Sequence, residues 1–183
     1  MKISWLLALA VTPALAQINA GTQAPTAEKP FAITKVAEFN LPWRIAFLPD
    51  GRMLITEKGG KVFLATQQGQ KTEVSGVPAV QFGGQNGLLG IYTAPTFDKD
   101  RGVYLTYSEP GEDPATSSLA LAHATLDTKG APTLAGLKVI WRDPIKGKGG
   151  QQGAAVAFSP DKKLLYLTVG ERQRFTPAQD PNQ

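Results

Sequence analysis

The feature that most constrains the fold is a pattern that occurs three times along the chain. It consists of an apolar run, a turn and a second apolar run. The first copy has apolar residues at 45–48 (IAFL), a Pro-Asp-Gly turn at 49–51 and a second run at 53–56 (MLIT). A Gly-Gly turn at 59–60 then leads to a third run at 62–65 (VFLA). Short apolar runs separated by such turns are typical of β-hairpins.

The second copy follows the same plan with longer strands. Runs at 88–92 and 103–107 flank a turn-rich connection over 95–102, and two more runs lie at 119–126 and 137–141. Four consecutive strands of this kind form one antiparallel sheet. The segment 31–39 also alternates between apolar and polar residues, ahead of the first copy.

The third copy begins at 154–158 (AAVAF), has a Pro160-Asp161 turn and continues at 164–168 (LLYLT). Threonine ends the second run of the first and third copies, at Thr56 and Thr168, and Thr106 has the equivalent place in the second copy. The separations are 50 and 62 positions. A period on the order of 50 residues with four strands per unit is typical of β-propeller blades. We therefore predict an all-β fold, a β-propeller of which this chain holds about two and a half blades.

An incomplete ring leaves apolar blade faces open, because each blade packs against its neighbours. We expect the 183 residues to be part of a longer sequence. The alternative is a short chain that associates with other copies.

The N-terminus predicts export. Lys2 precedes an apolar run over 3–11, and Ala14-Leu15-Ala16 resembles a cleavage site, so residues 1–16 are predicted to be a secretory signal peptide. The alternative is a buried first helix. Residues 17–30 are polar and rich in Ala, Thr and Pro, which predicts a flexible leader, and the domain then occupies 31–183. The location is predicted to be periplasmic or extracellular, with no membrane span after the signal.

Charge and cysteine content exclude several kinds of function. The net charge is only +4, and Lys146 and Lys148 have no aromatic residues between them, so we expect no nucleic-acid partner. The chain has no cysteine, which excludes disulfides, thiolate metal sites and iron–sulfur clusters. The glycine-rich stretch 147–150 lacks the Gly-Lys-Ser/Thr of a phosphate loop and is interpreted as a loop between blades.

Four segments together resemble one known family. They are 41–51 (LPWRIAFLPDG), 84–90 (GQNGLLG), 149–161 and 168–172 (TVGER). Their order and spacing resemble the glucose/sorbosone dehydrogenase family, the soluble aldose dehydrogenases that use pyrroloquinoline quinone (PQQ), from about residue 36 to the end of the chain. The resemblance implies a six-bladed propeller that binds PQQ and calcium. It also implies a small sugar substrate, which loses hydride from C1 to the quinone and a proton to a base, and an electron acceptor that the sequence does not identify.

The resemblance also implies roles for single residues. Gln85 corresponds to a glutamine at the family's sugar site, where an amide can both donate to and accept from hydroxyl groups. Gln151 stands where the family has its catalytic histidine, and an amide is not a base at neutral pH. Glu171 could replace that base if it turned inward, although a structural role in its loop fits equally well.

The remaining candidates have ordinary structural interpretations. The single histidine, His123, lies in an alternating strand and is predicted to be a strand residue. Trp43 and Trp141 could stack on sugar, but each flanks a strand and is predicted to pack between blades. Two functions remain open: a PQQ-dependent oxidoreductase acting on aldoses, sugars or polyols, and a catalytically lapsed propeller that binds a carbohydrate or a protein partner.

Overall fold

The computed structural model describes residues 31–174, 180 and 182, so the predicted signal peptide and leader lie outside the described residues. The chain divides into two units, Met1–Lys35 and Val36–Gln183. Of the first unit only residues 31–35 are described, and they form no helix or strand. In the part of the chain that the structure describes, no helix is long and apolar enough to cross a membrane.

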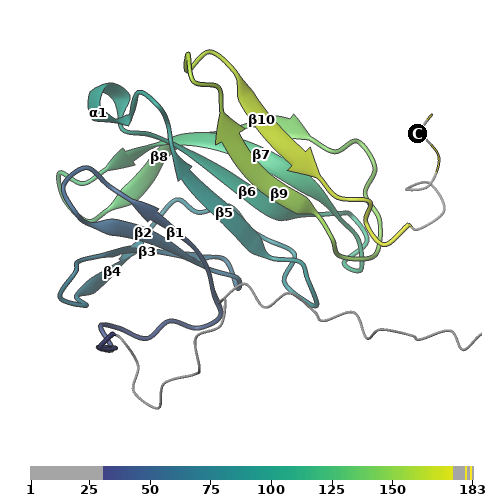
Figure 1. The fold of residues 1–183 in the computed structure, drawn as a ribbon. Coiled ribbons are helices and arrows are strands. Elements are labelled where there is room, and N and C mark those ends of the chain that lie inside the picture. Colours follow the sequence, from purple (N-terminus) through teal and green to yellow (C-terminus); the bar gives the residue numbers. More distant parts are fainter. Residues whose placement is uncertain (1–30, 175–179, 181, 183) are drawn as a thin grey trace, which may run out of the picture. The chain divides into compact units, whose positions relative to one another are not determined.

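The second unit begins with a four-stranded antiparallel sheet, blade 1, whose strands follow the chain order (Figure 1). The strands are β1 (Pro42–Phe47), β2 (Met53–Glu57), β3 (Lys61–Ala65) and β4 (Lys71–Val74). The Pro-Asp-Gly turn joins β1 to β2, as the sequence predicts, and Gly51 there has a φ of 83°. Such a left-handed backbone favours glycine.

Blade 2 repeats this order with longer strands. It contains β5 (Leu88–Thr93), β6 (Gly102–Pro110), β7 (Ser117–Asp127) and β8 (Thr133–Arg142), and a one-turn helix, α1 (Phe97–Asp100), joins β5 to β6. A third sheet has two strands, β9 (Gly153–Phe158) and β10 (Leu165–Val169). Two four-stranded sheets and one two-stranded sheet confirm the all-β prediction and the count of two and a half blades.

Two details differ from the sequence prediction. The strand β4 was not predicted, because its sequence KTEV has three exposed residues and only Val74 buried. The alternating segment 31–39 forms no strand. Its last residue, Phe39, instead packs edge-on against Phe63 of β3, with ring centroids 5.8 Å apart.

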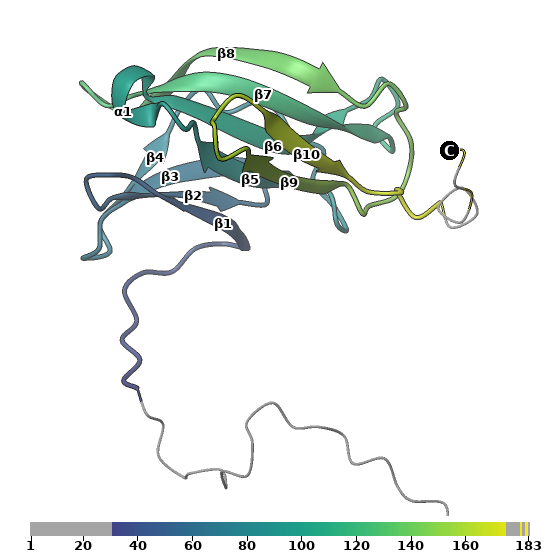
Figure 2. The ribbon, with the colours of Figure 1, turned by 45° about the horizontal axis from the view of Figure 1, so that its top comes forward.

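The core lies between successive blades. Leu54 and Val62 of blade 1 belong to the same buried cluster as Ile91 and Leu105 of blade 2. Blade 2 meets β9 through smaller clusters, one of which joins Tyr92 to Val156. The strand β5 contacts both β1 and β9, and the β9–β10 pair lies against blade 2 (Figures 1 and 2).

The pairing of the first two strands is irregular at the same place in every blade. The register shifts between Pro42 and Arg44 in β1 and between Leu88 and Gly90 in β5. In the third sheet, β9–β10, the register shifts between Leu167 and Val169, the residues on either side of Thr168. The three repeated threonines of the sequence therefore mark three equivalent β-bulges, which often re-aim a side chain beside a functional site.

Candidate functional site

The bulged ends of β1, β5 and β9 surround one cavity of about 220 Å³. The bulged residues Trp43 and Leu89 line it, and Gly153 of β9 does the same. Its other lining residues come from the loops that precede β5 and β9: Gln85, Gln151 and Gln152. The cavity therefore combines an indole, an aliphatic side chain and three amides, with no charged residue in its lining.

Gln85 and Gln151 meet at this cavity, although 66 positions separate them in the chain. The backbone N–H of Gln151 donates to Oε1 of Gln85 at 2.8 Å. Gly150 makes this approach possible, because a Cβ at that position would lie 2.5 Å from Oε1 of Gln85. The contact uses the main chain of Gln151, and its exposed side chain remains at the cavity.

Asn86 joins the loop that precedes β5 to the loop that precedes β9. Its Oδ1 accepts from Nε2 of Gln152 at 2.8 Å, and its Nδ2 donates to the carbonyl of Gly149 at 3.2 Å. Gln152 is only 3% exposed and belongs to no strand. The sequence analysis gave neither residue a role, although both lie in segments that carry the family resemblance, 84–90 and 149–161.

Trp43 contradicts the prediction that it packs between blades. Its side chain is 55% exposed and lines the cavity. Nζ of Lys58 lies 5.7 Å from the Trp43 ring centroid and contacts the carbonyl of Gly84, in the turn that carries Gln85. Trp43 lies at the register shift between Pro42 and Arg44, next to the cavity.

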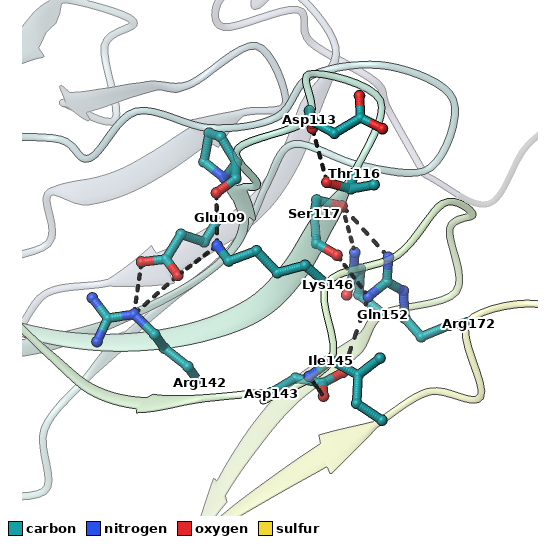
Figure 3. A network of polar contacts seen from close by, with 11 residues as sticks. Glu109, Asp113, Thr116, Ser117, Arg142, Asp143, Ile145, Lys146, Gln152 and Arg172 are labelled. Atoms are coloured by element: carbon teal, nitrogen blue, oxygen red, sulfur yellow. Dashed lines mark hydrogen bonds and ion pairs between the residues drawn. The ribbon is translucent and has the colours of Figure 1, made fainter.

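Arg172 is a further residue that the sequence analysis did not single out. Its side chain is buried against the loop that leads into β9, and Figure 3 shows its contacts with Ser117 and Asp143. Burial lowers the pKa of Arg172 below its ordinary value, and the nearby charge of Asp143 opposes this shift. The guanidinium remains a cation at neutral pH, since arginine starts so far above it.

Glu171 is not brought to the cavity lining with the two glutamines. It is half-buried, and its Oε2 has no hydrogen-bond partner among the described residues. Its role as a substitute base stays a prediction. His123 lies in β7 opposite Tyr104, and their rings form an edge contact at 5.0 Å. It is a strand residue outside the cavity lining.

Trp141 is likewise in a strand, β8, opposite Leu121 of β7. Its side chain is 37% exposed, and it does not line the cavity. Of the two tryptophans singled out from the sequence, the structure therefore brings only Trp43 to the candidate site.

The residues that line the cavity fit a polyhydroxy compound better than they fit PQQ or calcium. Side-chain amides can exchange hydrogen bonds in both directions with hydroxyl groups, and an indole offers an apolar face. Three carboxylates, as in PQQ, call for cationic partners, and the cavity lining has none. Among residues 31–174, 180 and 182, no group of three or more His, Cys, Asp or Glu side chains is placed to hold a metal.

Comparison with known proteins gives a consistent family. The family model described as Glucose / Sorbosone dehydrogenase matches residues 39–183. The aldose sugar dehydrogenase YliI of Escherichia coli (strain K12) is 34% identical over 141 residues, which are 76% of this chain and 38% of the relative.

Two solved structures share the fold. The soluble aldose sugar dehydrogenase of Escherichia coli in its apo-form is 33% identical, with a TM-score of 0.69 over 77% of this chain and 41% of that one. The PQQ-bound form of the aldose sugar dehydrogenase from Streptomyces coelicolor is 28% identical, with a TM-score of 0.71 over 86% of this chain and 46% of that one. The chain thus spans less than half the length of each of these relatives.

Proposed function

Because the chain belongs to the glucose/sorbosone dehydrogenase family, we propose that its protein is a PQQ-dependent oxidoreductase. The proposed substrates are aldoses or related sugars and polyols, which would transfer hydride to the quinone. Relatives named as aldose sugar dehydrogenases support the substrate class, and the relative described in a PQQ-bound form supports the cofactor. Export to the periplasm or outside the cell is part of the proposal and rests on the sequence of residues 1–16.

The observation that carries the proposal is that Trp43, Gln85 and Gln151 line one cavity. Oε1 of Gln85 accepts from the backbone of Gln151, so its amide NH₂ can donate to a substrate oxygen. The side chain of Gln151 can both donate and accept. The three residues would bind and orient a sugar without neutralising any charge.

PQQ is proposed from the family and from the PQQ-bound relative, and calcium from the family alone. The uncharged lining of the cavity does not match the carboxylates of PQQ, and the described residues offer no acidic cluster for calcium. Residues other than those that line the cavity would have to bind both groups. The proposed roles of Trp43, Gln85 and Gln151 depend on neither group.

No residue that lines the cavity can act as the base that removes the proton. A general base must lie within hydrogen-bond reach of the hydroxyl that it deprotonates. Gln151 lies at the cavity, but its amide can only hydrogen-bond to the hydroxyl and cannot accept its proton. Glu171 has the chemistry, but it is outside the cavity lining.

The identity of residue 151 therefore favours a second candidate function. A propeller that binds a carbohydrate, or a protein partner, without oxidising it would need the amides and the indole and no base. The two candidates predict the same cavity and differ in turnover and in quinone binding.

A dye-linked aldose oxidation assay on the full-length protein separates them, with and without added PQQ and calcium. Turnover that requires both additions supports the oxidoreductase and implies a base other than Gln151. Sugar binding without turnover, and with no quinone bound at micromolar concentration, supports the binding propeller. The Gln85→Ala variant tests the cavity itself, since it should weaken sugar binding under either candidate function.

A further inference from the structure

Two segments of backbone interlock directly behind the cavity. The first, 147–153, leads into β9 and carries Gln151, and the second, 170–174, leaves β10. A Cβ at Gly170 would lie 1.8 Å from the carbonyl oxygen of Gln151, and a Cβ at Gly149 would lie 2.7 Å from that of Arg172. These approaches leave no room for a side chain, so the two segments pack main chain against main chain.

The same segments hold non-glycine residues in a left-handed backbone conformation. Gln151 has a φ of 50°, and Arg172 and Gln173 each have a φ of 60°. A non-glycine residue in this region is strained and persists only where its surroundings enforce it. Something beyond local preference must therefore hold the segment that carries Gln151.

The Arg172 side chain supplies that constraint. Its Nε donates to the carbonyl of Gly150 at 3.2 Å, and its Nη2 donates to the carbonyls of Gly147 at 3.0 Å and Gly149 at 3.2 Å. Its Nη1 donates to the carbonyl of Ser117, in β7, at 3.1 Å. One planar group thus ties three carbonyls of the 147–150 stretch to blade 2.

Because Arg172 is buried, its charge depends on these hydrogen bonds. The residue is only 6% exposed, and the anionic oxygen of Asp143 is 4.0 Å away. Since this carboxylate is no nearer than 4.0 Å, the buried cation depends mainly on hydrogen bonds to carbonyl oxygens, which are stronger when the donor is charged. Removing it would leave several buried carbonyls without their partner.

The neighbouring side chain completes the arrangement. Oε1 of Gln173 accepts from the backbone N–H of Gly150 at 3.1 Å, and the next N–H, of Gln151, donates to Gln85. The direction of the peptide at Gln151 therefore depends on bonds made at Gly150 and Gly149.

We propose that Arg172 is a positioning residue for the cavity. It holds the 147–151 segment so that the Gln151 N–H reaches Gln85 and both side-chain amides stay at the cavity. The hydrogen bonds of its guanidinium go to carbonyl and hydroxyl oxygens of the protein, so it acts through Gln151 and does not bind substrate or cofactor itself. The consequence for sugar affinity rests on the proposed function, whereas the anchoring of the segment does not.

The test compares Arg172→Gln and Arg172→Lys with Arg142→Gln in the full-length protein. Arg142 is the matched control, because it is a guanidinium at the end of β8 in blade 2, with a side chain 53% exposed and paired with Glu109. Lysine keeps the charge but lacks the planar fork that reaches several carbonyls at once. If Arg172→Gln does not fold, Arg172→Lys carries the test.

Two readouts are measured: amide hydrogen exchange by peptide, and glucose binding followed by tryptophan fluorescence. We expect exchange in 147–153 to rise at least tenfold in both Arg172 variants, with β6 and β7 unchanged, and the glucose Kd to rise about tenfold to a hundredfold. The control should change neither by more than about twofold. A purely structural role would instead raise exchange throughout blade 2.

Each outcome decides something. Unchanged exchange in 147–153 in a folded Arg172 variant overturns the proposal. Faster exchange with an unchanged Kd shows that the segment is anchored but that its position does not matter to the sugar, which also overturns the positioning role. Failure of the unaltered protein to bind glucose or another aldose rejects the proposed function, and the exchange data then decide the anchoring alone.

Discussion

Replacing Gln151 by histidine tests whether this position lacks only a base. The substitution should leave the local backbone unchanged, because the contact with Gln85 uses the main-chain N–H of residue 151. Histidine also tolerates the left-handed conformation, with φ at 50°, better than most residues. The imidazole would then lie at the cavity that Gln85 and Trp43 line.

The expected gain follows from what a positioned base contributes. General-base catalysis accelerates a step by about 10²–10⁴-fold. Residue 151 is exposed, so its imidazole should titrate near the unperturbed pKa of about 6.5 and be roughly 90% neutral at pH 7.5. We expect kcat to rise by about a hundredfold or more at that pH, and to fall as the pH decreases below about 6.5, where the imidazole is protonated.

The assay is aldose oxidation by the full-length protein with PQQ and calcium present, from pH 5.5 to 8.5. The Gln151→Leu variant is the control, because it has a similar volume and neither donates nor accepts a proton. If the histidine variant binds quinone and sugar but shows neither a higher kcat nor a new pH dependence, residue 151 is not where the base acts.

Three further predictions concern the fold around the cavity. Thr106 is fully buried and donates to the carbonyl of Ala154 at 3.0 Å, so Thr106→Val should lower the free energy of unfolding by about 1–2 kcal/mol in urea denaturation. Gly170→Ala places a methyl group against the carbonyl of Gln151 and should both destabilise the protein and weaken sugar binding about tenfold or more, measured by thermal melting and titration. Partial burial raises the pKa of Glu109, and hydrogen bonds from two cationic side chains lower it by more, so that it lies below its ordinary 4.5. A carboxyl group whose pKa is lowered by folding stabilises the folded state at neutral pH, and this stabilisation is lost as the pH falls from 4.5 through the lowered pKa. Glu109→Gln should therefore lower the free energy of unfolding by about 0.5–1 kcal/mol at pH 7 and leave it unchanged in strong acid.

Two of these predictions have matched control variants. Thr125 is exposed in β7, and Thr125→Val should leave the free energy of unfolding within about 0.5 kcal/mol of the unaltered protein. Gly59 has nothing within 4 Å of an added Cβ, so Gly59→Ala should leave sugar binding unchanged. Equal losses in a variant and its control would contradict the assigned contact. An equal cost of Glu109→Gln at pH 7 and pH 3 would contradict the ionic explanation.

The fold could be predicted because its signals are local. Apolar runs, Pro-Asp and Gly-Gly turns and the repeated threonines indicated the strands, their order and the number of blades. The strand β4 escaped because an outer strand with one buried residue has no alternating pattern to detect. The segment 31–39 misled because alternation alone does not supply a partner strand, and Phe39 packs on β3 through its side chain instead.

The candidate site could be predicted only in part. Gln85 and Gln151 were found through the resemblance of their motifs, and the structure brings them together. Arg172 and Asn86 were missed, since their importance lies in contacts with carbonyls and amides far along the chain. Trp43 was assigned to a blade interface because a tryptophan beside a strand usually packs, and the bulge at that position is not visible in sequence.

The sequence by itself determined the blades, because strand and turn preferences act between neighbouring residues. It also supplied the side chains of the candidate site, among them the amides of Gln85 and Gln151. Only the tertiary structure decided that three bulges converge on one cavity and that Arg172 holds the segment beside it. Those features depend on backbone groups, which every residue carries alike, and on packing between residues that lie 55 positions apart, as Ser117 and Arg172 do.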